Sequence, residues 1–161
     1  MKKKYFSFLL ITLIIYACEY SSNKTSTNVV NENKQAIEKE ITIILNSDDL
    51  MKFDQNILIV KTGQKIALTL NHSGRLNKSL MGHNFVLLKK DVDITDFAER
   101  AIKATENEYI PEGDETIAYT KLIGGGESDT ITFDAPEKGV YTYICSFPGH
   151  YLMMRGKFIV N

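Results

Sequence analysis

The segment GVYTYICSFPGHYLMMRGKFIV, residues 139–160, decides the fold, because two strand-like runs flank a short loop rich in turn residues. β-Branched and aromatic residues fill both runs, GVYTYIC and GKFIV, as expected of β-strands. Pro148 and Gly149 favour a tight reversal between them. The loop would hold Cys145 at the end of one strand and bring His150 back toward its sulfur.

Similar runs recur upstream and predict an all-β domain. They are IEKEITIILN, ILIV, KIALTL, HNFVLL and DTITF, and Asn, Ser, Asp and Gly punctuate them. Seven or eight strands at this spacing are typical of a β-sandwich or barrel.

One stretch, DITDFAERAIKATEN at 93–107, has the period of a helix instead of a strand. Its apolar residues follow the i, i+3, i+4, i+7, i+8 pattern and are Ile94, Phe97, Ala98, Ala101 and Ile102. Asp93 or Thr95 could cap the start. We therefore expect one amphipathic helix, inserted between strands and covering one side of the sandwich. The run GGGE at 124–127 lacks a following Gly-Lys-Ser/Thr, so it predicts a turn and not a phosphate-binding loop.

The N-terminal segment MKKKYFSFLLITLIIYAC reads as a signal sequence. Three lysines precede an apolar run from Tyr5 to Ala17, which is too short to span a bilayer comfortably. The ending IYAC resembles a bacterial lipobox. That resemblance implies a lipoprotein signal peptide over residues 1–17, lipidation of Cys18 and a membrane-anchored periplasmic protein. An ordinary secretory peptide or an uncleaved anchor, with Cys18 incidental, is the alternative.

Residues 18–36 would form a tether between the lipid and a folded domain at 37–161. The segment is rich in Ser, Thr, Asn and Lys and shows neither the period of a helix nor that of a strand. Removal of residues 1–17 would take three lysines and no acid from 19 basic and 20 acidic residues, leaving a net charge of −4. This charge gives no support to nucleic-acid binding.

Cys145 needs its own explanation in an exported protein, because with Cys18 lipidated it has no partner for an internal disulfide. Burial, intermolecular pairing or a metal would each account for it. A thiolate with imidazole nitrogens selects copper, zinc or iron. His72 and His83 are the other histidines, and Gly82 would let its carbonyl approach a metal beside His83.

Three motifs in this order, MGHNFVLL, TKLIGGGESDTITF and YICSFPGHYLMMRGKFIV, resemble the azurins over residues 41–161. The resemblance implies a cupredoxin-like Greek-key β-sandwich and a one-electron carrier with a single type 1 (blue) copper ion. It also implies a set of copper ligands, namely His83, Cys145 and His150 in the equatorial plane, Met154 as a weak axial ligand and the carbonyl of Gly82 opposite.

The resemblance extends to residues around the ligands. Asn84 would hold the loop through hydrogen bonds at Ser146, and His72 would lie near the copper without binding it. An apolar patch through which one histidine ligand reaches the surface would consist of Met51, Leu76, Met81, Phe147, Pro148, Leu152 and Met153. Met51 and Leu76 could instead pack beneath the loop. The implied partners are redox proteins such as cytochromes, or copper or haem reductases and oxidases, met by a monomer in transient complexes.

Two departures from the azurin pattern concern stability. Ile41 and Gln64 stand where azurins have a disulfide, and Phe85 replaces a buried tryptophan. The ligand set is complete, and four protein ligands would leave no open position for a substrate, so we do not expect an enzyme. A copper-binding lipoprotein for storage or delivery is the alternative function. An adhesion-type β-sandwich would leave the order of Cys, His and Met unexplained.

Overall fold

The structure, a computed structural model, describes residues 39–161. The predicted signal peptide and tether fall at positions 1–36, outside the described residues. Within the described part, no helix is both long and apolar enough to cross a membrane.

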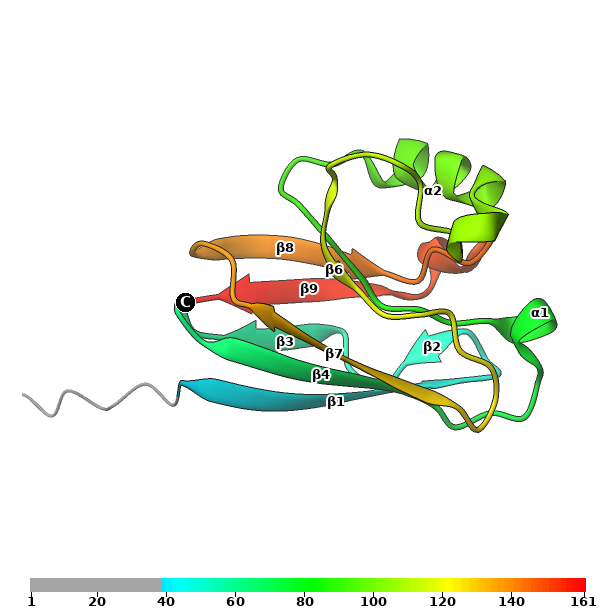
Figure 1. Cartoon of the computed structure of the whole chain (residues 1–161), viewed down its shortest axis with the longest axis horizontal. Coiled ribbons are helices and arrows are strands. Elements are labelled where there is room, and N and C mark those ends of the chain that lie inside the picture. Colours follow the sequence, from blue (N-terminus) through cyan, green and yellow to red (C-terminus); the bar gives the residue numbers. More distant parts are fainter. Residues whose placement is uncertain (1–38) are drawn as a thin grey trace, which may run out of the picture. The chain divides into compact units, whose positions relative to one another are not determined.

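Two β-sheets face each other in a sandwich (Figure 1). One sheet has the order β2 (Lys52–Phe53), β1 (Glu40–Asp48), β4 (Lys65–His72), β7 (Ser128–Asp134). The other has the order β3 (Ile57–Val60), β9 (Arg155–Val160), β8 (Gly139–Ile144), β5 (Val86–Leu88), β6 (Thr116–Tyr119). The predicted sandwich is confirmed, and the described strands form two open sheets and not a closed barrel.

Strand direction places several chain reversals at one end of the sandwich. β1 runs parallel to β4, β3 runs parallel to β9, and β8 is antiparallel to both β9 and β5. As a result β1, β4 and β8 all finish at the same end, where β5 begins. Figure 1 shows the loops of that end on the right, and the C-terminus and the start of β1 at the opposite end. We call the right-hand end the loop end and the other the terminal end.

Alternating side chains build the core between the sheets. In β4 every second residue, Ile66, Leu68 and Leu70, is fully buried, and Leu45 of β1 packs with them. Phe85 is also fully buried in this cluster, its ring centroid 5.3 Å from that of Tyr143. Phenylalanine therefore fills the core position where the azurin resemblance leads us to expect tryptophan.

The predicted helix is α2 (Ile94–Lys103), and Asp93 caps it by accepting hydrogen bonds from the backbone N–H of Thr95 and Asp96. Its buried residues lie over the outer face of the second sheet, where Val86, Leu88 and Ile144 also form part of a second hydrophobic cluster. Ile102, expected on the buried face, is 48% exposed because the helix turns it away from the sheet. The GGGE run is a turn, as predicted, with Gly126 at a φ of 82°.

Some elements differ from the sequence-based expectation. The strand predicted from His83 begins only at Val86, and His83 forms an isolated bridge with Ile123. Two short strands, β2 and β6, and one helical turn, α1 (Lys78–Met81), were not predicted. These elements are too short to show a period. Two 3₁₀ turns, Thr105–Asn107 and His150–Leu152, complete the fold.

Candidate metal centre

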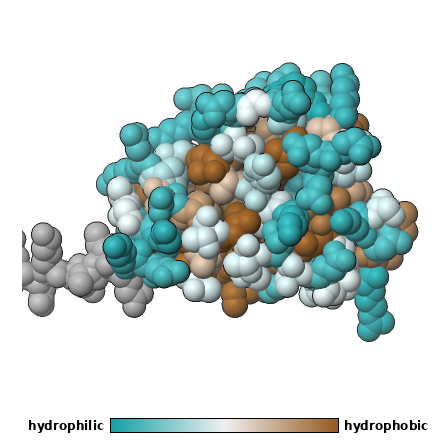
Figure 2. All heavy atoms as spheres, in the orientation of Figure 1, coloured by the Kyte–Doolittle hydropathy of each residue, from teal (hydrophilic) through white to brown (hydrophobic). Residues whose placement is uncertain are grey.

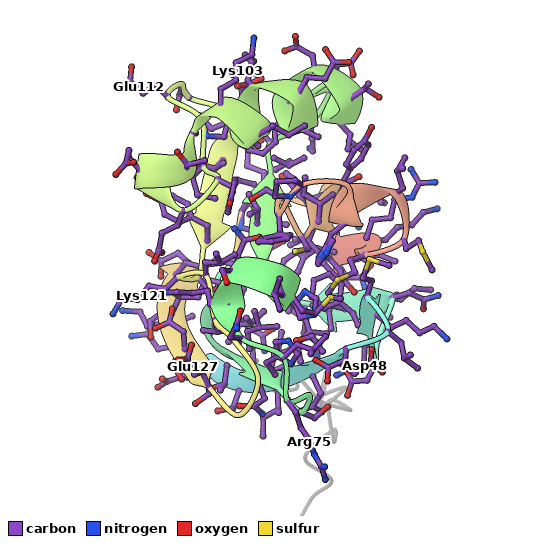
Figure 3. The ribbon with its side chains drawn as sticks, turned by 90° about the vertical axis from the view of Figure 1, so that its right-hand side faces the viewer. Asp48, Arg75, Lys103, Glu112, Lys121 and Glu127 are labelled. Atoms are coloured by element: carbon purple, nitrogen blue, oxygen red, sulfur yellow. The ribbon has the colours of Figure 1, made fainter. Side chains whose placement is uncertain are left out.

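Three side chains converge at the loop end, in the region that Figure 3 views head-on. The Sγ atom of Cys145 lies 3.9 Å from Nδ1 of His83 and 3.7 Å from Nδ1 of His150. The two Nδ1 atoms are 3.2 Å apart. All three residues are buried, and they form the one cluster of three or more metal-ligating His, Cys, Asp or Glu side chains in residues 39–161.

The size of this triangle fits a transition-metal ion. The point equidistant from three atoms so separated is about 2.1 Å from each, while bonds from a metal such as zinc to imidazole nitrogen and thiolate sulfur are about 2.0–2.1 and 2.3 Å. Two imidazoles and a thiolate are also the donors that copper takes in electron-transfer sites. The residues present therefore fit one copper ion.

Backbone hydrogen bonds close the loop from Cys145 to Met154. The N–H of Cys145 donates to the carbonyl of Met154 at 2.9 Å, and the N–H of Met154 donates to the carbonyl of His150 at 2.7 Å. Gly149 reverses the chain with a φ of 80°, in the left-handed region that glycine adopts without strain. The loop thus holds the sulfur and the His150 ring by main-chain contacts at both of its ends.

A different part of the chain fixes His83. Its N–H and carbonyl exchange 2.9 Å hydrogen bonds with Ile123. Its Nε2 lies 2.9 Å from the carbonyl of Asp48, which can only accept, so Nε2–H is the donor. The tautomer follows from this contact, because Nδ1 then keeps its lone pair and directs it toward Cys145 and His150.

Asn84 joins the two halves of the centre. Its Oδ1 accepts from the N–H of Ser146 at 2.8 Å, and its Nδ2 donates to Oγ of Ser146 at 2.9 Å and to the carbonyl of Glu108 at 3.2 Å. Asn84 follows His83 and Ser146 follows Cys145, so these bonds fix the separation of the two ligating residues. Both are buried, and the structure thus brings together the pair expected from the sequence.

Gly82 and Met154 also border the centre. The carbonyl of Gly82 lies 3.8 Å from Sγ of Cys145. A Cβ atom at position 82 would come within 2.6 Å of the carbonyl of Lys78, so only glycine fits here. Met154 is fully buried in a cluster with Cys145, Phe147 and Leu122.

Burial keeps all three potential ligands uncharged in the absence of metal. It raises the pKa of the Cys145 thiol to about 12. Burial, followed by the nearby His83, lowers the pKa of His150 to about 4, and burial also lowers the pKa of His83. Neutral imidazoles are the form that binds metal, whereas the thiol must lose its proton to a metal ion.

His72 is buried beside the centre but outside the ligand triangle. Its ring centroid is 4.4 Å from that of His83. Nδ1 accepts from the N–H of Gly74 at 3.0 Å, and Nε2 donates to the carbonyl of Met81 at 2.9 Å. Both nitrogens are thus engaged with backbone, and the ring supports the segment that leads to His83.

The residues of the expected apolar patch differ in exposure. Leu152, Met153 and Leu76 are 63, 59 and 40% exposed, whereas Phe147 is only 9% exposed and lies beneath the surface, against Tyr109 and His150. The structure therefore removes Phe147 from the patch. Met51, Met81 and Pro148 are half-buried.

Two further residues at this end were missed by sequence reasoning. Leu50 and Leu80 are 64 and 65% exposed, in the turn after β1 and in α1. Figure 2 shows hydrophobic atoms at the right-hand edge, where Figure 1 places α1. The exposure of Leu80 could not be foreseen because α1 was not predicted. His150 is 4% exposed.

Comparison with known proteins agrees with this geometry. A family model described as copper binding proteins of the plastocyanin/azurin family matches residues 39–161. The azurin of Alcaligenes faecalis is 41% identical over 120 residues, covering 71% of this chain and 93% of that protein. The azurin of Pseudomonas fluorescens biotype C is 41% identical over 123 residues, covering 73% of this chain and 95% of that protein.

Solved structures give the same result. Auracyanin A, a "blue" copper protein from Chloroflexus aurantiacus, is 31% identical with a TM-score of 0.69, and the match covers 76% of this chain and 99% of that one. The azurin Az-iso2 of Methylomonas sp. strain J is 34% identical with a TM-score of 0.68, covering 77% and 98%. The azurin resemblance, the cupredoxin fold and the blue copper electron carrier expected from the sequence are confirmed. The chain belongs to the plastocyanin/azurin family of copper-binding proteins.

Proposed function

We propose that His83, Cys145 and His150 hold the single copper ion of this blue copper electron carrier. The observation that carries the assignment is the triangle of Sγ and two Nδ1 atoms, whose size fits one such ion. The thioether of Met154 and the carbonyl of Gly82 would hold the ion more weakly, supported by the full burial of Met154 and the 3.8 Å from the Gly82 oxygen to Sγ of Cys145. When bound, copper supplies a reversible one-electron change between Cu(II) and Cu(I).

The protein's contribution is a centre that moves little. Asn84 bonds Ser146, Ile123 holds the backbone of His83, and Met154 closes the loop on Cys145. Each contact is buried or part of a backbone pair, so the donor atoms stay in place whichever charge the centre carries. A fixed donor set lowers the rearrangement that electron transfer requires. With its positions filled by protein groups, the centre has no site for a substrate, and we propose that the chain is not an enzyme.

We propose His150 as the point where electrons enter and leave. His150 is buried, but it lies in the same 3₁₀ turn as Leu152 and just before Met153, and these two side chains are more than half exposed. Small apolar surfaces suit brief docking, because little area must be separated afterwards. The partners would be redox proteins such as cytochromes, or copper or haem reductases and oxidases.

Location is proposed from the sequence alone. The lysines, the short apolar run and the IYAC ending support export to the periplasm and a lipid anchor at Cys18. Acyl chains each contribute about 0.8 kcal/mol per buried methylene, so two or more would hold the protein stably on a membrane. Intact mass of the protein purified from membranes tests this, since a mature chain starting at Cys18 with added acyl mass is expected.

The ligand assignment is tested by adding Cu(II) to residues 19–161 and recording the visible spectrum. An intense blue band from charge transfer between thiolate and copper is expected, and Cys145→Ala should remove it. Ser146→Ala, next in the chain but without a donor to the metal, is the matched control and should keep the band. A colourless protein would refute the proposal. Reversible voltammetry of the blue protein would then separate an electron carrier from a protein that stores or delivers copper.

A further inference from the structure

We propose that the second sheet carries a membrane-contact face, which sits on an anionic lipid surface and lies away from the copper centre. We call it the basic-aliphatic face and define it as Ile57, Ile59, Val140, Arg155, Lys157 and Ile159. It builds on the proposed export and lipid anchor, but neither its structure nor its test depends on the lipid.

Strand register places these residues on one surface. Ile59 of β3 and Val140 of β8 both pair with Ile159 of β9, which gives an aliphatic row across three strands. In the neighbouring row, two residues farther from the terminal end, Ile57 pairs with Lys157. Helix α2 covers another part of the same sheet around Ile144 and leaves these rows open.

The aliphatic side chains of this face are unusually exposed. Ile57, Ile59 and Val140 are 51, 57 and 57% exposed, and Ile159 between them is half-buried. Strand propensity alone would explain a single exposed Ile or Val. Four such residues in adjacent positions on an outer face, however, make a continuous apolar surface.

The charges on this face are all positive. The three strands, ILIV, GVYTYI and RGKFIV, contain Arg155 and Lys157 and no acid. The whole chain, by contrast, has more acids than bases. Arg155 and Lys157 line a groove of about 470 Å³ that extends to Ile94 at the start of α2 and has room for a lipid headgroup. None of the described residues that line this groove is an acid, and Asp93, next to Ile94 in the chain, caps the helix.

The point where the N-terminal segment joins the domain favours a membrane as the occupant. The carbonyl of Lys39 accepts from the N–H of Lys65, and Asn161 accepts from the N–H of Thr62, so both lie at the terminal end. The row of Ile59, Val140 and Ile159 is close to that end, because Val60 pairs with Val160. The 20 residues between Cys18 and Lys39 span at most about 70 Å in any conformation.

A lipid at Cys18 would therefore keep the domain within about 70 Å of the bilayer. On an anchored protein even a weakly binding face contacts the lipid surface for much of the time, because the anchor gives this second contact a high effective concentration. Aliphatic side chains enter the interface while Arg and Lys pair with anionic headgroups. Contact there would leave the loop end, with His150, free for redox partners.

Vesicle cosedimentation of copper-loaded residues 19–161, without lipid, tests this face. The matched relatives consist of little more than this domain, which supports its folding alone. Vesicles of phosphatidylglycerol and phosphatidylethanolamine should retain the protein, more weakly as salt rises, whereas phosphatidylcholine should not. Arg155→Glu with Lys157→Glu should reduce partitioning by more than about 25-fold, at about fivefold for each cation lost.

Controls come from other surfaces of the same domain. Lys103→Glu with Lys121→Glu makes the same charge change at two exposed sites labelled in Figure 3, and should cost far less binding. Ile59→Ser should weaken binding about tenfold, while Ile44→Ser, at a 55% exposed position on the other sheet, should not.

Three outcomes would overturn the proposal: no retention by anionic vesicles, equal loss in face and control variants, or a dimer in sedimentation that the face variants abolish. The last would assign the face to a second copy of the chain. The blue band of each variant reports the copper centre separately, so failure of this proposal leaves the proposed ligands untouched.

Discussion

Replacement of Asn84 by alanine should destabilise the domain through lost hydrogen bonds while leaving the proposed ligands in place. Asn84 is fully buried and makes two hydrogen bonds as acceptor and two as donor. Alanine would leave the N–H of Ser146 unsatisfied, at a cost of about 1–3 kcal/mol, and would lose the contacts with Oγ of Ser146 and with the carbonyl of Glu108, at about 0.5–1.5 kcal/mol each. We expect a loss of about 3 kcal/mol in the free energy of unfolding.

Urea denaturation of the metal-free protein measures this loss, with Ser146→Ala and Asn84→Asp as matched variants. Ser146→Ala removes only the hydroxyl and keeps its N–H bonded to Asn84, so it should cost about 1 kcal/mol. Asn84→Asp keeps the acceptor but directs a carboxylate oxygen at the carbonyl of Glu108. If Asn84→Ala and Ser146→Ala lower the free energy of unfolding equally, the reasoning is refuted, because the hydrogen bond from the backbone N–H of Ser146 would then contribute no stability.

Four further predictions concern the core, the helix, pH and the surface. Phe85→Ala should cost about 3–5 kcal/mol of unfolding free energy in urea and Phe85→Leu clearly less, and equal losses for the two variants would contradict this. Asp93→Ala should cost about 1 kcal/mol by loss of the cap, while Thr95→Ala, whose side chain caps nothing, should be near neutral in the same assay. The metal-free protein should lose stability as pH falls from about 6.5 toward 4. In this range the unfolded chain binds a proton at His150, whereas the folded protein, in which the pKa of His150 is about 4, does not. A urea midpoint that stays constant over this range would contradict the prediction. Leu152→Lys or Met153→Lys should slow electron self-exchange, measured by NMR line broadening, whereas Ile44→Lys on a distant surface should not.

The sequence predicted the elements that repeat a period and the loop that holds three of the proposed ligands. Strand alternation in IEKEITIILN and KIALTL and the helical period around Phe97 gave β1, β4 and α2, because burial on one face imposes the pattern. The three motifs MGHNFVLL, TKLIGGGESDTITF and YICSFPGHYLMMRGKFIV, in this order, were sufficient to show the resemblance to the azurins.

The sequence could not predict features that arise only from packing. The segment ahead of Val86 looks like strand, yet Gly82 and His83 leave the ladder so that His83 can bond Asp48 and Ile123. The azurin resemblance places Phe147 in the surface patch, but Tyr109 and His150 pack against its ring. Such outcomes depend on contacts between segments far apart in the chain, which no local pattern records.

The pairing of Val86 with Ile144 has a consequence for the order in which this protein matures. His83 and Cys145 are separated by 62 positions, so their donor atoms meet only after β5 has docked on β8. Metal capture should therefore be a late event that reports a completed fold. Once captured, an ion shared by the two segments closes a long loop reversibly, and it would act as the cross-link that this chain lacks at Ile41 and Gln64. A chain exported unfolded would thus gain its final stability only where copper is available.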